Sequence, residues 1–161
     1  MDSDLDYLRA AYKYAASYSD DPNTQNGAVL VLADGSVHLG TNRIPPSVRR
    51  SPERLESPEK YSWIEHAERD AIMSACRAGE STLGSTLYCP WFACPDCARS
   101  IIQSGVSEVV GHAATMSRTP DRWASLLATA ATMLHEAGVK ARIVGGDVGV
   151  SLRFDGQVIE A

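Results

Sequence analysis

The sequence has no long hydrophobic run, and its first residues are not basic. No stretch approaches the roughly 18 apolar residues of a transmembrane helix, so we expect no membrane span. The chain begins Met1-Asp2-Ser3-Asp4, which is acidic where a signal peptide is basic. These absences predict a cytoplasmic protein.

Positive charge is also in deficit. Fifteen Lys and Arg stand against 20 Asp and Glu, which gives a net charge of −5 and an isoelectric point near 5.3. A protein that follows a phosphate backbone usually has the opposite balance, because its affinity comes from neutralised phosphates. We therefore expect no nucleic-acid partner, whereas a small anionic ligand that needs one or two arginines remains compatible.

Cysteine is scarce, which excludes a framework stapled by many disulfides. At 161 residues and 44% hydrophobic, the chain is long and apolar enough to build one core, and we expect a single domain over 1–161. In a chain that is not exported, cysteines are more often metal ligands or buried thiols than disulfides. The four cysteines are Cys76, Cys89, Cys94 and Cys97.

Hydrophobic periodicity and turn residues predict helices and strands in alternation. Helices are expected over 4–18, 64–78, 95–104 and 121–137, and strands over 27–32, 37–40, 85–89, 107–110 and 139–144, with a hairpin over 151–159. Residues 41–61 are proline-rich and are expected to form a long irregular loop. This order predicts an α/β fold with one mixed sheet, covered by helices and parallel in its second half.

The strongest chemical signal is His66-Ala67-Glu68, followed by Cys94-Pro95-Asp96-Cys97. Two thiols three residues apart at a helix start can face one metal, and the helix N-terminus lowers their pKa. With His66 they make three ligands, the number that a catalytic zinc site uses while it keeps a position for water. Zinc lowers the pKa of such a water toward about 7, and Glu68 stands beside it as a proton carrier.

A structural zinc site is the alternative from the same residues. Such a site needs four protein ligands, and Cys89 is a candidate for the fourth. The chain would then be a non-catalytic, zinc-stabilised binding module in which Glu68 has no purpose. If zinc is catalytic, Cys76 and Cys89 are expected to be buried core thiols.

The stretch from about Tyr12 to Val110 resembles the cytidine and deoxycytidylate deaminase superfamily. Residues 21–29 resemble its first strand, and residues 87–98 resemble its ligand strand and helix. Residues 40–45 resemble the Gly-Tyr-Asn-Gly-x-Pro loop of deoxycytidylate deaminases, and residues 66–72 their His-Ala-Glu-x-Asn-Ala-Ile. The sequence departs from this pattern at three positions, with Arg43 for Gly, Asp70 for Asn and Ala93 for the proline before the first ligand cysteine.

The resemblance implies a three-layer α/β/α fold with one catalytic Zn²⁺ per chain, held by His66, Cys94 and Cys97. It implies that Glu68 takes a proton from water and delivers protons to N3 and the leaving amino group of a cytosine ring. The leading reaction is conversion of deoxycytidine monophosphate (dCMP) to dUMP and ammonia. The resemblance also implies a homo-oligomer.

Two other enzyme classes remain open. One is a tRNA adenosine deaminase, against which the acidic charge argues. The other is a deaminase of another free or modified pyrimidine base, nucleoside or nucleotide.

Candidate substrate contacts follow from the same resemblance and from residue type. Asn42 is expected to hydrogen-bond the sugar, and the backbone of Ala67 to hold the ring. Aromatic side chains near the ligand loop are expected to wall the base, and arginines near the motifs to meet a phosphate. These are Tyr88 and Trp91 for the base, and Arg43 and Arg77 for the phosphate.

Overall fold

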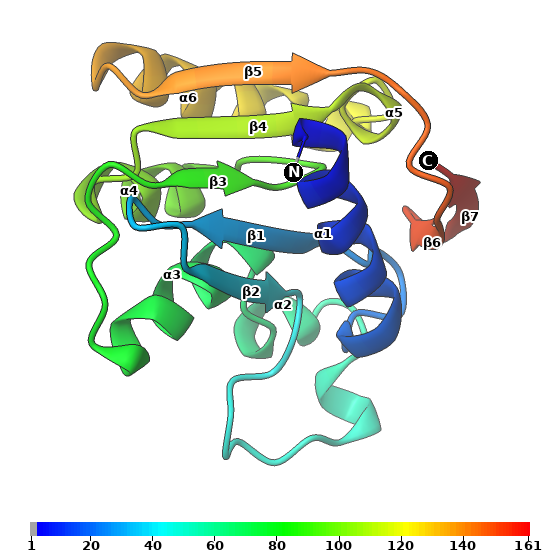
Figure 1. Ribbon diagram of the computed structural model, residues 1–161. Helices are drawn as coiled ribbons and strands as arrows, with labels where there is room; N and C mark the ends of the chain where they lie inside the picture. The colour runs from blue at the N-terminus through cyan, green and yellow to red at the C-terminus, as the bar shows by residue number, and fades with distance from the viewer. Residues whose placement is uncertain (1–2) are drawn as a thin grey trace.

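A five-stranded mixed sheet forms the centre of the computed structural model, which describes residues 3–161 (Figure 1). The strands are β1 (Gly27–Val31), β2 (Val37–Thr41), β3 (Thr86–Tyr88), β4 (Glu108–His112) and β5 (Lys140–Val144), in the order β2-β1-β3-β4-β5. β1 runs antiparallel to β2 and β3, whereas β3, β4 and β5 are mutually parallel. The mixed sheet with a parallel second half is therefore confirmed.

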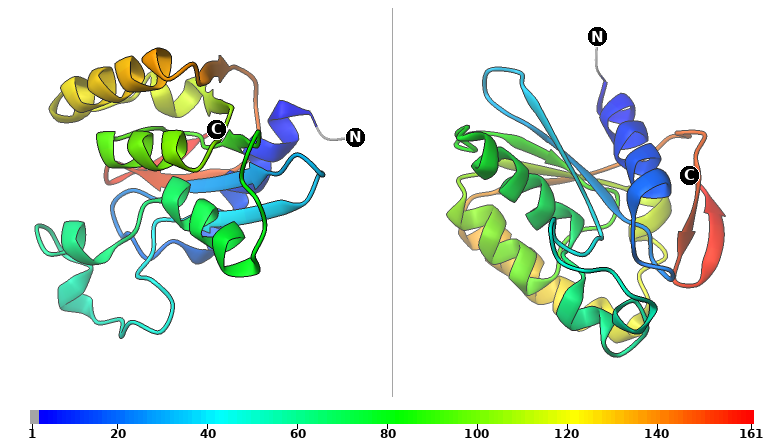
Figure 2. Two further views of the ribbon diagram at one scale, coloured as in Figure 1. Left: turned by 90° about the vertical axis from the view of Figure 1, so that its left-hand side faces the viewer. Right: turned by 90° about the horizontal axis from the view of Figure 1, so that it is seen from below.

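Helices cover both faces of this sheet, which makes the three layers expected from the sequence (Figures 1 and 2). On one face lie α1 (Asp4–Tyr18) and a separate hairpin of β6 (Ser151–Phe154) and β7 (Gln157–Glu160). On the other face lie α3 (Ala67–Ala78), α4 (Pro95–Gln103) and α6 (Asp121–Glu136). Each face has its own cluster of buried apolar side chains.

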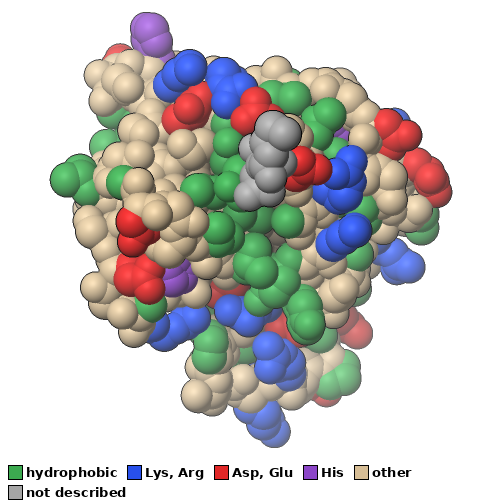
Figure 3. Space-filling view, in the orientation of Figure 1, with side chains coloured by type: hydrophobic (Ala, Val, Ile, Leu, Met, Phe, Trp, Pro, Cys, Tyr) green, Lys and Arg blue, Asp and Glu red, His purple; other side chains and the backbone are tan. Residues whose placement is uncertain are grey.

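Strand alternation divides side chains between the two clusters. Successive side chains of a strand point to opposite faces, so in β3 Leu87 joins the cluster under α3 and α4 while Tyr88 joins the cluster under α1. α1 alone does not cover its face completely: Val37, at the outer strand, keeps 46% of its surface exposed. In the space-filling view of this face, hydrophobic side chains gather among acidic and basic groups (Figure 3).

The structure corrects the helix expected over 64–78. α3 begins at Ala67, and a separate one-turn helix, α2 (Lys60–Trp63), precedes it. The chain between them is extended because Arg43 and Glu65 pair backbone to backbone, with N···O distances of 3.2 and 2.8 Å. The end of α3 matches the expectation, since Gly79 closes it in the left-handed conformation at φ 75°.

Three smaller differences concern loops and a cysteine. The proline-rich loop contains a 3₁₀ turn, η1 (Pro52–Arg54), and a short helix, α5 (Ala113–Met116), follows β4. Cys89 is buried as expected, but Cys76 is exposed near the end of α3, so the prediction that Cys76 is a core thiol is wrong.

Among the described residues no helix is long and apolar enough to cross a membrane. Met1 and Asp2, from the acidic start used to predict the location, lie outside the described residues.

Candidate metal centre and catalytic cavity

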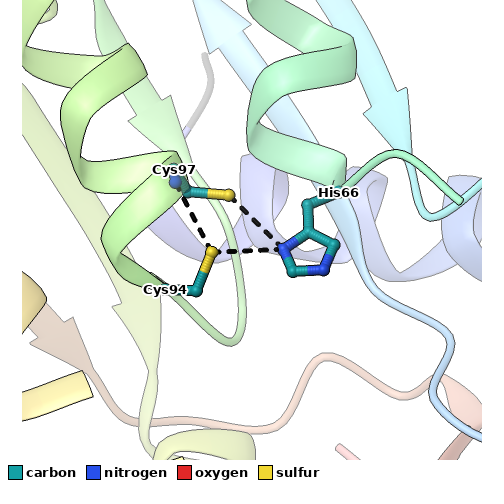
Figure 4. A group of neighbouring side chains, drawn as sticks. All are labelled: His66, Cys94 and Cys97. Atoms are coloured by element: carbon teal, nitrogen blue, oxygen red, sulfur yellow. Dashed lines mark hydrogen bonds between the residues drawn. The ribbon is translucent and has the colours of Figure 1, made fainter. Parts of the chain in front are cut away.

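Three potential metal ligands meet where the N-termini of α3 and α4 approach each other (Figure 4). His66 is the N-cap of α3, Cys94 is the N-cap of α4, and Cys97 lies in the first turn of α4. The Nδ1 atom of His66 lies 3.4 Å from Sγ of Cys94 and 3.5 Å from Sγ of Cys97. The ligand atoms all lie within 4.8 Å of one another, so one ion can bind all three.

The electrostatics of this cluster favour a cation. A hydrogen bond from the Cys97 side chain, with further help from His66, lowers the pKa of Cys94 to about 3, although burial opposes the shift. The same contact and burial raise the pKa of Cys97 well above its usual value. A thiolate, a second thiol and an imidazole at two helix N-termini form a nitrogen and sulfur donor set that fits zinc.

Glu68 lies beside this cluster and lines the same cavity as His66 and Cys94. Its side chain is buried, with 3% of its surface exposed, and burial raises its pKa to about 7. A carboxyl group with such a pKa can both accept and donate a proton near neutral pH. The motif spacing thus places a proton carrier next to the metal ligands in three dimensions.

The cavity opens to solvent, and the empty space within it and at its solvent-filled mouth amounts to about 640 Å³. Trp91, Phe92 and Ala93 of the ligand loop form one wall, while the exposed Tyr61 and Arg122 stand at its outer part. Of the two expected base-walling aromatics, Trp91 is in this wall, and its Nε1 donates to Oγ1 of Thr119 at 3.0 Å.

Asn42 also lines the cavity, as expected for a substrate contact. Its Oδ1 accepts a hydrogen bond from the backbone N–H of Ala67 at 3.1 Å, and its Nδ2 donates to the carbonyl of Thr24 at 3.0 Å. The backbone N–H of Ala67, which was expected to hold the ring, is therefore already bonded to Asn42. One hydrogen of the Asn42 amide group remains for a ligand.

Tyr88 faces away from the cavity, which corrects its expected role in walling the base. Its ring stacks on Tyr7 with 4.7 Å between centroids, and its hydroxyl donates to Asp4 at 3.1 Å. The cause is the strand alternation, which sends this side chain to the α1 face.

Neither arginine expected to meet a phosphate lies in the cavity wall. Arg77 is exposed in the last turn of α3, about 15 Å along the helix axis from the N-terminus that carries the ligand. The guanidinium of Arg43 is paired with the carboxylate of Asp70, so the two departures from the family pattern in this region contact each other. Both assignments are corrected.

Sequence reasoning missed a buried ion pair in the cavity wall. Nζ of Lys60 lies 2.9 and 3.0 Å from the two carboxylate oxygens of Asp21, and both residues line the cavity. The two residues are 39 positions apart, so no local spacing could have revealed the pair. Trp123 was also missed: it is half-buried, lines the cavity and lies 6.0 Å from the ring of Tyr61.

Fold and site together define a class of protein. A His-Cys-Cys cluster at two helix N-termini, with a buried glutamate that is not a ligand, is the arrangement of zinc-dependent nucleobase deaminases. The comparisons with known proteins place the chain within this class. A family model described as the cytidine and deoxycytidylate deaminase zinc-binding region matches residues 1–113.

Several curated relatives have the same assignment. An uncharacterized deaminase in the luxG 3′ region of Aliivibrio fischeri is 36% identical over 127 residues, which cover 77% of this chain and 82% of that protein. Human deoxycytidylate deaminase is 33% identical over 114 residues, which cover 65% of this chain and 62% of that enzyme. The chain therefore belongs to the cytidine and deoxycytidylate deaminase family. It is a zinc-dependent hydrolase that acts on C–N bonds.

Solved structures show the same fold. The crystal structure of dCMP deaminase from the cyanophage S-TIM5 in complex with dCMP and dUMP has a TM-score of 0.68 to this chain, with 24% sequence identity. The match covers 89% of this chain and 99% of the cyanophage chain. This likeness confirms the cytidine-deaminase-like α/β architecture.

Proposed function

We propose that this chain hydrolyses dCMP to dUMP and ammonia. The observation that carries the proposal is the approach of His66, Cys94 and Cys97 to within 4.8 Å, with Glu68 buried on the same cavity. In this proposal the first three residues hold zinc, and a bound zinc ion supplies an activated water.

Glu68 carries the proton transfers. Its carboxylate accepts one proton from the attacking water and donates it to N3 of the ring, and then accepts the remaining proton of the same oxygen and donates it to the departing amino group. One C–O bond forms and one C–N bond breaks at C4, so that cytosine and water become uracil and ammonia. In this proposal Trp91 and Asn42, which line the cavity, contact the base and the sugar respectively.

The proposed phosphate contacts are the two Lys and Arg residues of the cavity lining, Lys60 and Arg122. Lys60 is the stronger candidate because it is buried, with 5% of its surface exposed, whereas Arg122 is exposed and is ion-paired with Asp155. A nucleotide substrate is also supported by the relatives named deoxycytidylate deaminase and by the dCMP and dUMP bound in the cyanophage structure.

The geometry weighs against the structural-zinc alternative. Among the described residues the group of potential ligands contains three members, and Cys89 is not one of them. The sulfur of Cys89 instead contacts the Asn26 side chain at 3.3 Å and the carbonyl of Trp91 at 3.4 Å. A closed site would need a fourth protein ligand at that position.

A substrate panel tests the proposal. The zinc-loaded protein is incubated with dCMP, deoxycytidine, cytidine, cytosine and a tRNA substrate for adenosine deamination, and ammonia release is followed. We expect the highest kcat/KM for dCMP. Turnover of tRNA alone would favour the adenosine deaminase alternative, and turnover of none of these compounds would refute the proposal. The cytoplasmic location and the homo-oligomer remain predictions.

A further inference from the structure

Two residues that depart from the family pattern form one buried ion pair. Arg43 stands where the resembling loop has glycine, and Asp70 stands where the helix motif has asparagine. Nε of Arg43 lies 2.8 Å from Oδ2 of Asp70, in an orientation that makes an ionic contact rather than a hydrogen bond. The terminal nitrogen Nη2 donates to Oδ1 of Asp70 at 3.0 Å.

The pair fastens the end of β2 to the start of α3. Oδ2 of Asp70 accepts a hydrogen bond from the backbone N–H of Thr41 at 3.1 Å. The backbone of Arg43 pairs with Glu65 in both directions, directly before the ligand His66. The residue between these anchors is Asn42, whose Oδ1 accepts from the N–H of Ala67. Asn42 is therefore held from both sides by contacts of its neighbours.

Burial explains why the two departures occur together. The side chain of Asp70 is 4% exposed and that of Arg43 is 20% exposed. A carboxylate at such burial destabilises the fold strongly when its charged partner is removed. An asparagine at position 70 could accept the same hydrogen bond from Thr41, but it is uncharged and needs no arginine beside it. The backbone at Arg43 is not in the left-handed region, so glycine is not required there.

We propose that Arg43 and Asp70 replace the Gly/Asn pattern together, since the charge of each compensates the charge of the other. We further propose that their ion pair positions Asn42. In this chain the contact between the Arg43 side chain and Asp70 holds the loop against α3. This proposal rests on the proposed function in one respect, since it takes Asn42 to be a substrate contact. Neither Arg43 nor Asp70 lines the cavity.

A double-mutant cycle tests the pair. The variants are Arg43→Gly, Asp70→Asn and the double variant, which restores the family pattern at both positions. Arg43→Gly leaves a buried carboxylate without its partner, so we expect KM for dCMP to rise about tenfold or more and the melting temperature to fall by at least about 6 °C. Asp70→Asn frees an arginine whose side chain is 20% exposed and can turn to solvent, and we expect a smaller rise in KM.

The double variant distinguishes a pair from two independent residues. We expect its KM to return to within about threefold of the unmodified protein, with most of the melting temperature recovered, because the buried charge is gone. Zinc content and kcat are expected to stay within about twofold in all three variants, since the metal ligands are not part of the pair. Arg43→Lys keeps the charge and is expected to rescue most of the KM.

A matched control comes from the same loop. Arg50 pairs with Asp20 at 2.8 Å, but its side chain is 52% exposed, so Arg50→Gly is expected to change KM by less than about threefold. Additive losses of stability and KM in the double variant would refute the compensated pair. If Arg43→Gly and Asp70→Asn lower kcat and leave KM unchanged, the proposal that the pair positions Asn42 is refuted.

The proposed function can fail separately. If the unmodified protein turns over another compound of the panel but not dCMP, that compound replaces dCMP and the cycle is measured on it. If it turns over none, the proposed function and the positioning role are both refuted. The unfolding measurements need no substrate, and they still decide whether Arg43 and Asp70 are coupled.

Discussion

Lys60→Met removes the buried cation from the cavity wall. Nζ of Lys60 gives two hydrogen bonds to Asp21, at 2.9 and 3.0 Å. An ammonium group has three donors, so one N–H remains for a ligand in the cavity. If the phosphate of dCMP binds there, the substitution removes one charge-assisted hydrogen bond to the nucleotide and none to the nucleoside.

The expected size of the effect follows from that one contact. A hydrogen bond to a charged group contributes about 1.5–3 kcal/mol, which corresponds to roughly a 10- to 140-fold rise in KM for dCMP. Deoxycytidine has no phosphate, and its KM is expected to change by less than about threefold. The ratio of kcat/KM values for the two substrates therefore falls by the same factor of roughly 10 to 140.

Stability must be followed in the same variant, because Asp21 loses its partner. Oδ1 of Asp21 also accepts from the backbone N–H groups of Asn23 at 2.8 Å and Thr24 at 3.1 Å. These bonds continue to solvate the carboxylate, so we expect a loss at the lower end of the range for broken buried pairs, about 3 kcal/mol. Lys60→Met combined with Asp21→Asn removes both charges and is expected to recover part of this loss.

Steady-state assays at a temperature where the variant is folded separate the two effects. Lys140→Met is a matched control: the side chain of Lys140 is 66% exposed, its Nζ lies 3.3 Å from Glu108, and it is not part of the cavity lining. Equal losses of kcat/KM for dCMP and deoxycytidine would show that Lys60 only stabilises the wall. Unchanged values for both would remove the phosphate from this part of the cavity.

Three further predictions concern chemistry, packing and pH. Glu68→Ala is expected to lower kcat by at least about 10²-fold while zinc stays near one per chain, because the residue moves protons and is not a ligand; metal analysis beside ammonia release checks this, and a loss of zinc would contradict it. Gly40→Ala places a methyl group 2.3 Å from backbone atoms of α3, so we expect the free energy of unfolding, measured by chemical denaturation, to fall by about 1–3 kcal/mol or more. Gly145→Ala is the control, because its methyl group would have nothing within 4 Å. Equal losses of stability in the two variants would refute the packing argument. Hydrogen bonds from Arg142 lower the pKa of Asp4, so their stabilisation is present at neutral pH and is lost as the pH falls below about 4. Arg142→Met should therefore lower the free energy of unfolding by about 1 kcal/mol at pH 7 and by less at pH 3. The same loss at both pH values would refute this prediction.

The sequence by itself determined the chemistry at the metal. His66 and Glu68 are two positions apart at one helix start, and Cys94 and Cys97 occupy the first turn of another, so local backbone geometry decides where these groups point. Caps, turns and periodicity likewise indicated most helices and strands, and the order of these elements along the chain indicated a mixed sheet. Caps and turns arise from local interactions, which are visible in sequence order.

The break before α3 shows where that reasoning stops. Periodicity alone continues the helix back to Ile64, but the pairing of Arg43 with Glu65 holds the chain extended there. The orientation of Tyr88 was in principle readable from alternation along β3, yet which face carries α1 depends on how the layers pack.

Only the tertiary structure decided what surrounds the metal centre. It brought Lys60 to Asp21 and Arg43 to Asp70, and both contacts join segments far apart in the chain. The physical reason is that a buried charge is stable only beside an opposite charge, and in a packed fold that partner can come from any part of the chain. The reactive groups are thus set by spacing along the chain, whereas the cavity walls that choose a substrate are set by packing.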